Sequence, residues 1–575
     1  MKTTMRKTSF QLEKKTKDVL RIIPLGGLEE VGRNMTCFEY GDDIIIVDMG
    51  LGFPEAETMP GIDFIVPNVE YLKDKKDKIR AIFITHGHYD HIGAIPYLID
   101  KIGNPPIYAT PLSRGIILRR QEDFPYSPEV KVIEFKKDEY HSIKEGVFEV
   151  EWFHVNHNIP DSVGFLIKTP VGNILHTGDF KIDFTPMCDL PANLNRIMEL
   201  SKNLTLLMAD STNASEPGHV TSEREIMKNL EEIFKSAPRR IFASTFASLI
   251  ERIQQLIWLS EKYNRKVVID GYTMKMNVEV AKALGYLKSE KYTFISPEEA
   301  LKLDPVRVTI ICTGAQGEDN SVLMRIASGE HRFFKIQPLD TVIFSSSVVP
   351  GNERAVQNLK DQLYRQGAKV FHYQMMDIHA SGHAFAEDLK LLLAITKPLY
   401  FMPIHGHYFM LKSAGEIAQS LGYEPERIII ASNGQVIEMM PGTVRLTDEF
   451  VPANYVFVDG LGIGDVGEVV LRDRQVMSTD GIFVIVTVID SQTGRLRTSP
   501  DIISRGFIYL RESQELLKEV RNLIKKIVAK SINQTTPWPL INEEYIKNNI
   551  KEELGNFLFK KTHRRPMIIP VIIQV

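Results

Sequence analysis

Four side chains of the kinds that bind divalent metals lie within six positions of one another, in the segment AIFITHGHYDHIG at residues 81–93. They are His86, His88, Asp90 and His91. Zinc and similar ions accept imidazole nitrogen and carboxylate oxygen as ligands, and two histidines one residue apart can bind one ion from the same side of a loop. A single histidine at the end of a strand usually makes only a structural hydrogen bond, but this spacing predicts a metal site.

The elements around this cluster would place its side chains at the end of a strand. Residues 81–84 are apolar and predict a buried strand, and residues 92–101 predict a helix that begins just after the cluster. Asp90 and His91 would then lie near a helix N-terminus, where the helix dipole favours a charged carboxylate. Further acidic and histidine side chains follow other predicted strands: His154, His157, Asp179, Asp210 and His405.

From about residue 216 helices and strands alternate, which predicts a parallel sheet with helices on its faces. Ligands of such sheets bind outside the carboxyl ends of the strands. Turns rich in serine, threonine and glycine fall at these ends, and their hydroxyls and backbone N–H groups suit a phosphate. Residues 399–403 predict a further strand, followed by His405. We interpret this strand as the return of the chain to the first domain, so the middle domain would be an insertion.

Composition and charge limit the class of protein. A chain of 575 residues with 43% apolar and 25% charged residues predicts two to four ordinary globular domains. The net charge of −4 gives no sign of a nucleic-acid partner, although a local positive groove remains open. The three separated cysteines argue against disulfides and thiolate zinc sites and fit a reducing cytoplasm. No apolar run predicts a membrane span or a secretory signal.

The motifs together carry a resemblance. HGHYDHIGA resembles the signature of the metallo-β-lactamase superfamily of two-metal hydrolases. The order FAS, CTGAQGE, SSSVVPGNE, HASGH and PIHG is similar to that of the β-CASP nucleases, and among them bacterial ribonuclease J. The resemblance extends from about residue 21 to about residue 511, which is most of the chain. It implies an α/β fold: a metallo-β-lactamase αββα sandwich, an inserted β-CASP α/β domain and a small α/β C-terminal domain.

We accordingly divide the chain as follows: a flexible basic tail at 1–19, the metallo-β-lactamase domain at 20–215 and 385–450, the β-CASP domain at 216–384, a glycine-containing linker at 451–470, and the C-terminal domain at 471–575.

The resemblance also implies a ligand set for two divalent ions, with zinc expected and manganese or magnesium as alternatives. His86, His88 and His157 would hold one ion, Asp90, His91 and His405 the other, and Asp179 would bridge both. Such ions share a hydroxide, lower its pKa and stabilise the oxygens of an in-line attack on phosphorus. His154 has the right chemistry but not the family position, so we expect it and His176 to lie beside the site without binding metal.

Catalytic and substrate-binding roles are implied in the same way. His383 would be the general acid that protonates the departing 3′ oxygen, and the alternative for it is a structural hydrogen bond. Asp90 and Asp210 are the other expected catalytic residues, with Asp210 orienting His383 or a metal ligand. The residues expected to hold a terminal phosphate are Ser248, His379, Ala380, Ser381, Gly382 and His383.

The implied function is 5′-to-3′ exonuclease and endonuclease action on RNA, preferably 5′-monophosphorylated, in mRNA decay and rRNA maturation. It implies a cytoplasmic homodimer or homotetramer, with RNA-decay helicases or the ribosome as further partners. A small-molecule metallo-hydrolase, a DNA-directed nuclease and a non-catalytic RNA-binding or assembly subunit are the alternatives. Departures from the family pattern leave open the RNA path, the subunit contacts and the balance between exonuclease and endonuclease action: Tyr89, Leu249, Glu251, Tyr272, residues 348–349, His407 and Phe409.

Overall fold

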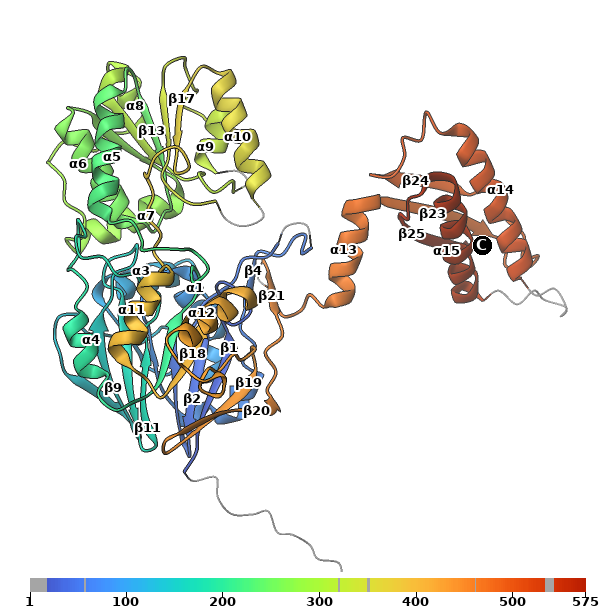
Figure 1. Cartoon of the computed structure of the whole chain (residues 1–575). Coiled ribbons are helices and arrows are strands. Elements are labelled where there is room, and N and C mark those ends of the chain that lie inside the picture. Colours follow the sequence, from blue (N-terminus) through green and yellow to red (C-terminus); the bar gives the residue numbers. More distant parts are fainter. Residues whose placement is uncertain (1–17, 56–57, 319–320, 349–351, 461, 533–541) are drawn as a thin grey trace, which may run out of the picture. The chain divides into compact units, whose positions relative to one another are not determined.

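The computed structural model describes residues 18–55, 58–318, 321–348, 352–460, 462–532 and 542–575 (Figure 1). The chain divides into two compact units, Met1–Gly52 with Val66–Val456 and Phe53–Ile65 with Phe457–Val575. Most of the basic tail predicted at residues 1–19 lies outside the described residues, as do positions 349–351 of the SSSVVPGNE motif.

The first unit contains a sandwich of two sheets. One has eight strands in the order β20-β19-β1-β2-β3-β5-β6-β7, and the other has six in the order β18-β12-β11-β10-β9-β8. Apolar side chains of both sheets fill the space between them, and the rings of Phe83 and Phe165 meet there edge to face, 5.8 Å apart. Helices α4 (Leu194–Leu200), α11 (Ala386–Thr396) and α12 (Tyr408–Ser420) pack on the outer face of the second sheet.

The strands of the eight-stranded sheet are β1 (Leu20–Gly26), β2 (Met35–Tyr40), β3 (Asp43–Val47), β5 (Ile79–Phe83), β6 (Ile107–Ala109), β7 (Val132–Glu134), β19 (Gln435–Met440) and β20 (Thr443–Phe450). Those of the six-stranded sheet are β8 (Ser142–Glu145), β9 (Phe148–His154), β10 (Val163–Thr169), β11 (Gly172–His176), β12 (Leu204–Asp210) and β18 (Tyr400–Ile404).

The middle of the chain forms a separate parallel sheet, as the alternation of helices and strands predicted. Its order is β14-β15-β13-β16-β17, and every neighbouring pair is parallel. The strands are β13 (Ile241–Ser244), β14 (Lys266–Asp270), β15 (Val308–Cys312), β16 (Thr341–Phe344) and β17 (Lys369–His372). The helices between them include α5 (Glu223–Ser236), α6 (Ile250–Lys262), α7 (Tyr272–Ala283), α9 (Val322–Ser328) and α10 (Glu353–Arg365).

This middle domain is an insertion in the sandwich. The chain leaves the six-stranded sheet after β12 and returns to it as β18, which pairs with β12 in parallel. Residue Asp210 is opposite Ile404 in that pair, so the end of β12 and the residue after β18, His405, come to the same edge of the sheet. The predicted return of the chain to its first domain is therefore confirmed.

The helix predicted at residues 92–101 is wrong in its extent. The structure has two four-residue helices instead, α1 (Tyr89–Ile92) and α2 (Ile95–Leu98), with a short 3-10 helix at Asp100–Ile102. Pro96 lies at the start of α2 and has no N–H to continue the hydrogen bonds of α1. Asp90 and His91 thus lie inside a single helical turn, where a dipole contribution to the carboxylate is small.

The second unit is a small α/β domain, as expected. Strand β23 (Ile482–Ile489) pairs antiparallel with β24 (Asp501–Arg505) and parallel with β25 (Met567–Gln574). Helices α14 (Gln514–Ser531) and α15 (Glu543–Thr562) share an apolar core with this sheet. Residues 53–65 belong to the same unit, since Asp63 N–H donates to Val458 O (2.9 Å). The predicted linker at 451–470 contains β21 (Val456–Asp459), β22 (Gly462–Ile463) and the start of α13 (Glu468–Asp480).

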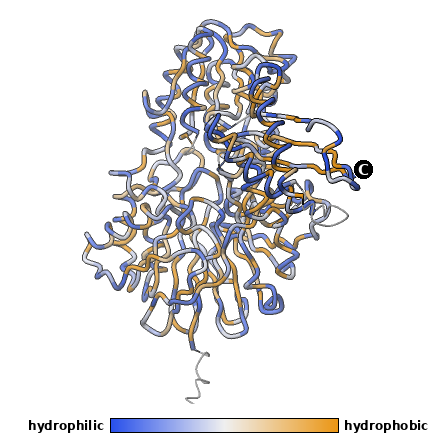
Figure 2. The backbone as a smooth tube through the Cα atoms, turned by 90° about the vertical axis from the view of Figure 1, so that its right-hand side faces the viewer, coloured by the Kyte–Doolittle hydropathy of each residue, from blue (hydrophilic) through white to orange (hydrophobic). Residues whose placement is uncertain are grey.

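Hydropathy changes over short distances along the backbone. Figure 2 shows short apolar and polar stretches alternating along the backbone. Among the described helices, none has both the length and the apolar composition that crossing a membrane requires.

Candidate active site

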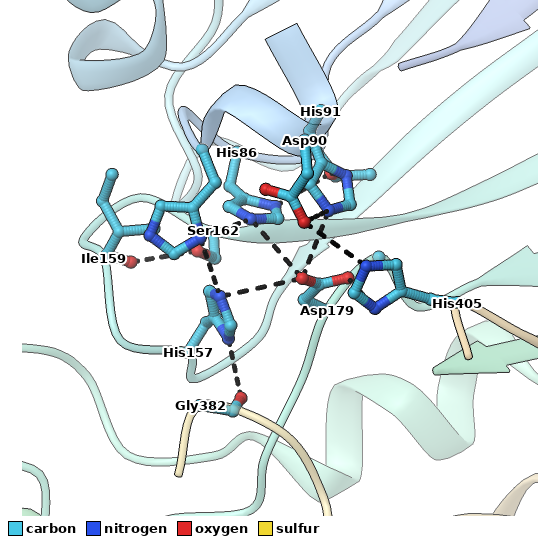
Figure 3. A network of polar contacts seen from close by, with 12 residues as sticks. His86, Asp90, His91, His157, Ile159, Ser162, Asp179, Gly382 and His405 are labelled. Atoms are coloured by element: carbon cyan, nitrogen blue, oxygen red, sulfur yellow. Dashed lines mark hydrogen bonds and ion pairs between the residues drawn. The ribbon is translucent and has the colours of Figure 1, made fainter. Parts of the chain in front are cut away.

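The first group of predicted metal ligands meets at the carboxyl end of β5 (Figure 3). His86 and His88 follow β5, and His157 lies in the loop after β9. The Nδ1 atom of His88 is 3.0 Å from Nε2 of His86 and 3.1 Å from Nε2 of His157. In a tetrahedral zinc site with Zn–N distances of about 2.0–2.1 Å, two nitrogens lie about 3.4 Å apart. One ion therefore fits among these three nitrogens after a small adjustment.

The protonation of these rings suits a metal. His157 Nδ1 donates to the carbonyl oxygen of Gly382 (2.7 Å), which leaves a lone pair on Nε2. His86 Nδ1 lies 3.0 Å from the Thr85 hydroxyl, so its Nε2 also faces the site. Burial lowers the pKa of His86 and His157 well below the ordinary value and takes the pKa of His88 to about 4. At neutral pH all three are in the neutral form that ligates metals.

A second group consists of Asp90, His91, Asp179 and His405, whose ligand atoms lie within 4.8 Å of one another. His91 Nε2 is 3.2 Å from Asp179 Oδ2, and His405 Nε2 is 3.4 Å from Asp90 Oδ2. His405 lies at the carboxyl end of β18 with φ +52°, in the left-handed region, and Asp179 follows β11. The return of the chain to the sandwich as β18 therefore brings His405 next to Asp90, more than 300 positions earlier in the sequence.

Asp179 lies between the two groups (Figure 3). Besides its contact with His91, its Oδ2 atom is 3.7 Å from Nε2 of His86 and 3.8 Å from Nε2 of His157. Burial opposes its charged form, but the protonated rings of His405 and His91, whose own pKa values are raised by neighbouring carboxylates, outweigh burial and hold the pKa of Asp179 well below its usual range. A charged carboxylate thus faces both sets of nitrogens, which is the position of a bridging ligand.

Unpartnered buried atoms support the fit to cations. Asp179 Oδ1 and His405 Nε2 are buried and make no hydrogen bond among the described residues, and each has only a longer ion-pair contact of 3.4 Å, to His405 Nδ1 and to Asp90 Oδ2 respectively. Burying such atoms is costly unless they bind something. With two carboxylates and five imidazoles converging, the donor set fits two divalent cations.

The residues around the predicted ligands fix the orientation of their side chains. His91 Nδ1 lies 2.7 Å from Asp48 Oδ2, which holds its Nε2 toward the site, and Asp48 also accepts from Thr85 N–H (2.8 Å). His176 Nδ1 accepts from Gly178 N–H (3.1 Å), next to Asp179. His154 lies in neither group, and its Nε2 contacts the carbonyl oxygen of Leu190 (3.0 Å).

His383 and Asp210 form a pair at the edge of the site. His383 Nδ1 is 2.7 Å from Asp210 Oδ2, and its ring centroid lies 5.5 Å from that of His405. Burial disfavours the imidazolium, but Asp210 outweighs it and raises the pKa of His383. Asp210 Oδ1 accepts from both the N–H and the hydroxyl of Thr212. Asp210 also belongs to a third group of possible metal ligands, with Asp179, His383 and His405. Both of its oxygens are hydrogen-bonded, whereas Asp179 Oδ1 has no hydrogen-bond partner among the described residues, so Asp210 is better placed to orient His383 than to bind an ion.

The predicted phosphate-binding segments lie side by side. The ring of His379 is 6.0 Å from that of Phe246, which joins the HASGH loop to residues 246–248. Burial and then the neighbouring Arg252 lower the pKa of His379 to about 3, so its ring is neutral. His379 Nδ1 and Ser346 Oγ are buried without a partner among the described residues. Both atoms lie beside the segments that follow β13 and β16, and within the described part of the chain neither makes a hydrogen bond.

Sequence reasoning missed a buried charged network beneath this loop. Arg252, fully buried on α6, donates to the carbonyl oxygen of Ile378 (2.6 Å) and to Glu223 (2.7 Å). Lys181, also buried, donates to Glu223 (3.2 Å). Asp183, also buried, accepts from Glu223 N–H (3.0 Å), so the network contains two cations and two carboxylates. An arginine on the apolar face of α6, four positions after Ser248, was the available signal.

The departures from the family pattern lie outside all three groups of possible metal ligands. Arg120 lies over the Tyr89 ring (4.3 Å), and the Tyr272 hydroxyl donates to Asp123 (3.2 Å). Glu251 is buried beside that network, and burial together with Glu223 and Asp189 raises its pKa to about 8. Leu249 is buried, His407 and Phe409 stack on each other, and position 349 lies outside the described residues.

The fold and the site define a class before any relative is considered. A two-sheet sandwich with imidazoles and carboxylates gathered at strand ends is a metal-dependent hydrolase of the metallo-β-lactamase type. Comparison with family models agrees, because residues 28–242 match the metallo-β-lactamase superfamily and residues 371–426 a Zn-dependent metallo-hydrolase RNA specificity domain. Residues 238–363 match the ribonuclease J β-CASP domain and residues 469–575 the ribonuclease J C-terminal domain.

Relatives match over nearly the whole chain. Ribonuclease J 1 of Streptococcus pyogenes is 40% identical over 96% of this chain and 97% of its own. Ribonuclease J of Thermus thermophilus is 39% identical over 97% of this chain and 96% of its own. Ribonuclease J2 of Bacillus subtilis is 36% identical over 98% of this chain and 100% of its own. The chain belongs to the ribonuclease J family, and the predicted class, a metal-dependent ribonuclease, is confirmed.

One solved structure shares the fold at low sequence identity. It is the crystal structure of a protein of unknown function from Enterococcus faecalis V583, with a TM-score of 0.54 and 20% identity over 73% of this chain and 100% of that chain.

Proposed function

We propose that this ribonuclease removes nucleotides from the 5′ end of 5′-monophosphorylated RNA and also cuts RNA internally, in mRNA decay and rRNA maturation. One observation carries the proposal. The loop expected to hold the terminal phosphate touches a metal ligand, because Gly382 O accepts from His157 Nδ1 (2.7 Å). A 5′ phosphate held by this loop would keep the first phosphodiester bond next to the ligand groups.

Two ions have a full set of ligands in this proposal. His86, His88 and His157 hold one, Asp90, His91 and His405 hold the other, and Asp179 bridges them. We expect zinc, which the matched RNA specificity domain names, with manganese or magnesium as alternatives. When bound, a pair of divalent cations lowers the pKa of a water molecule and stabilises the charged oxygens of an in-line displacement at phosphorus.

The remaining residues bind substrate and move a proton. His383 donates a proton to the departing 3′ oxygen, and Asp210 holds its ring in place through Nδ1. Asp90 completes the catalytic set as a ligand. The residues that hold the terminal phosphate are Ser248, His379, Ala380, Ser381, Gly382 and His383.

The cellular setting follows from the same family relation. We propose a homodimer or homotetramer, with RNA-decay helicases or the ribosome as further partners. We place the enzyme in the reducing cytoplasm, which its three free cysteines support. We also propose the domain boundaries that the sequence predicts.

End-labelled RNA tests the proposal directly. One RNA sequence is prepared with a 5′ monophosphate, a 5′ triphosphate or a 5′ hydroxyl, and each is incubated with enzyme, with and without a chelator. We expect release of mononucleotides from the monophosphate form alone, internal cuts in all three, and no product with chelator. Equal rates of mononucleotide release from the three forms would contradict the phosphate pocket, and activity in chelator would contradict the metal site.

A further inference from the structure

Asn213, which belongs to the sandwich domain, contacts the HASGH loop of residues 379–383, the loop proposed to bind the terminal phosphate. It lies in the turn after β12, three residues beyond Asp210, and its side-chain Nδ2 is 2.6 Å from Ser381 Oγ. The same Oγ accepts a hydrogen bond from the backbone N–H of His383 (3.0 Å). Both residues are partly buried, so the contact is shielded from bulk water.

These two contacts determine what the Ser381 hydroxyl can do. A serine hydroxyl has two acceptor lone pairs and one proton. The amide of Asn213 and the N–H of His383 supply protons to both lone pairs. Among the described residues Ser381 Oγ has only these two hydrogen-bond contacts, so its own proton is left for a third group. That third group has to be an acceptor, as a phosphate oxygen is.

The Ser345 hydroxyl, close by at the end of β16, shows the opposite arrangement. It accepts from the guanidinium of Arg252 and donates its proton to the carbonyl oxygen of Ile378 (2.6 Å). Its proton is therefore used inside the protein. Of these two serines only Ser381 has a proton free for a ligand.

The turn that carries Asn213 is held at several points. Thr212 donates from N–H to Asp210 Oδ1 (2.9 Å), and its hydroxyl lies 2.8 Å from His405 Nδ1. The carbonyl oxygen of Asn213 accepts from Glu216 N–H (3.0 Å). The amide is thus held in a fixed position between the metal ligands and the phosphate loop.

We propose that Asn213 is a positioning residue that sets the specificity of the enzyme for a 5′ monophosphate. It acts through Ser381, by making that hydroxyl an obligatory donor to the terminal phosphate. The inference rests on the proposed function, because it needs the HASGH loop to bind that phosphate. A neutral amide at this position also avoids the repulsion that a carboxylate would exert on the substrate.

The test is the substitution Asn213→Asp, which keeps the shape but turns the donor into a charged acceptor. The Ser381 proton would then turn toward Asp and away from the substrate. The measured quantity is kcat/KM on 5′-monophosphate RNA divided by kcat/KM on a circular RNA, which has no 5′ end. We expect this ratio to fall roughly 10- to 100-fold, the effect of losing a charge-assisted hydrogen bond. The control, Asn203→Asp, makes the same charge change at an exposed position and should keep the wild-type ratio.

A double-mutant cycle separates this role from a purely structural one. Asn213→Ala and Ser381→Ala are combined, and the ratio is measured for each single variant and for the pair. If Asn213 acts through Ser381, the double variant loses no more than Ser381→Ala alone. Additive losses, or an Asn213→Asp variant whose two activities fall equally, would overturn the inference. A wild-type enzyme with no 5′-monophosphate preference would instead overturn the proposed function.

Discussion

Glu251 offers a quantitative test of the structure, because it is a buried acid in a charged network. Its side chain is 3% exposed, and burial, followed by Glu223 and Asp189, raises its pKa from 4.5 to about 8. The folded state therefore holds this proton more tightly than the unfolded state does. Between pH 4.5 and pH 8 the unfolded state loses the proton first, so the contribution of Glu251 to stability falls as the pH rises.

The size of this effect follows from the two pKa values. The lost stability is about 1 kcal/mol at pH 5, about 3 kcal/mol at pH 7 and about 4 kcal/mol at pH 8, after which it levels off. Glutamine has the same shape and no charge, so Glu251→Gln removes the penalty. The variant should equal wild type near pH 4.5 and exceed it increasingly up to pH 8.

Thermal unfolding measured from pH 5 to pH 9 is the assay. Because the chain has several domains, the comparison uses the difference in Tm between variant and wild type rather than a fitted free energy. Glu232→Gln, at an exposed position on α5, is the control and should shift Tm by a constant small amount. A Tm difference for Glu251→Gln that does not change with pH, or a variant that is less stable at pH 8, would refute the reasoning.

Three further substitutions probe the site and the network. Asp179→Ala should reduce the bound metal, measured by elemental analysis, and abolish RNA hydrolysis; wild-type hydrolysis would show that the site is misassigned. At position 382 an added methyl group would lie 2.6 Å from His157 Cε1. Gly382→Ala should therefore weaken metal binding, measured by calorimetry, at least ten-fold. An unchanged affinity would show that the HASGH loop does not hold His157 in its position. Arg252→Met leaves buried Glu223 without its main partner and should cost about 3–5 kcal/mol, seen as a lower Tm; an unchanged Tm would show that the pair contributes little.

The local part of the site could be predicted from sequence because its geometry is local. His86 and His88 lie in the loop after β5, and Asp90 and His91 lie in the helical turn that follows it, so their spacing alone brings them together. His405 could not be placed by spacing, since its position depends on β18 pairing with β12 after the inserted domain at 216–384. The family resemblance supplied that contact, and the fold then explains it.

Other features depend on contacts that no local pattern reveals. Lys181, Glu223 and Arg252 come from three separate segments, and each looks ordinary in its own segment. Asn213 was overlooked for the same reason, because its partner Ser381 is 168 positions away. The helix after the metal loop was predicted too long because the apolar pattern outweighed Pro96, which ends the hydrogen-bond ladder.

Anomalous diffraction from crystals grown with zinc or manganese tests the central assignment most directly. We predict two peaks, one among His86, His88 and His157 and one among Asp90, His91 and His405, with Asp179 in contact with both ions. A map with no peak among these side chains, or with ions bound only elsewhere on the chain, would contradict the account.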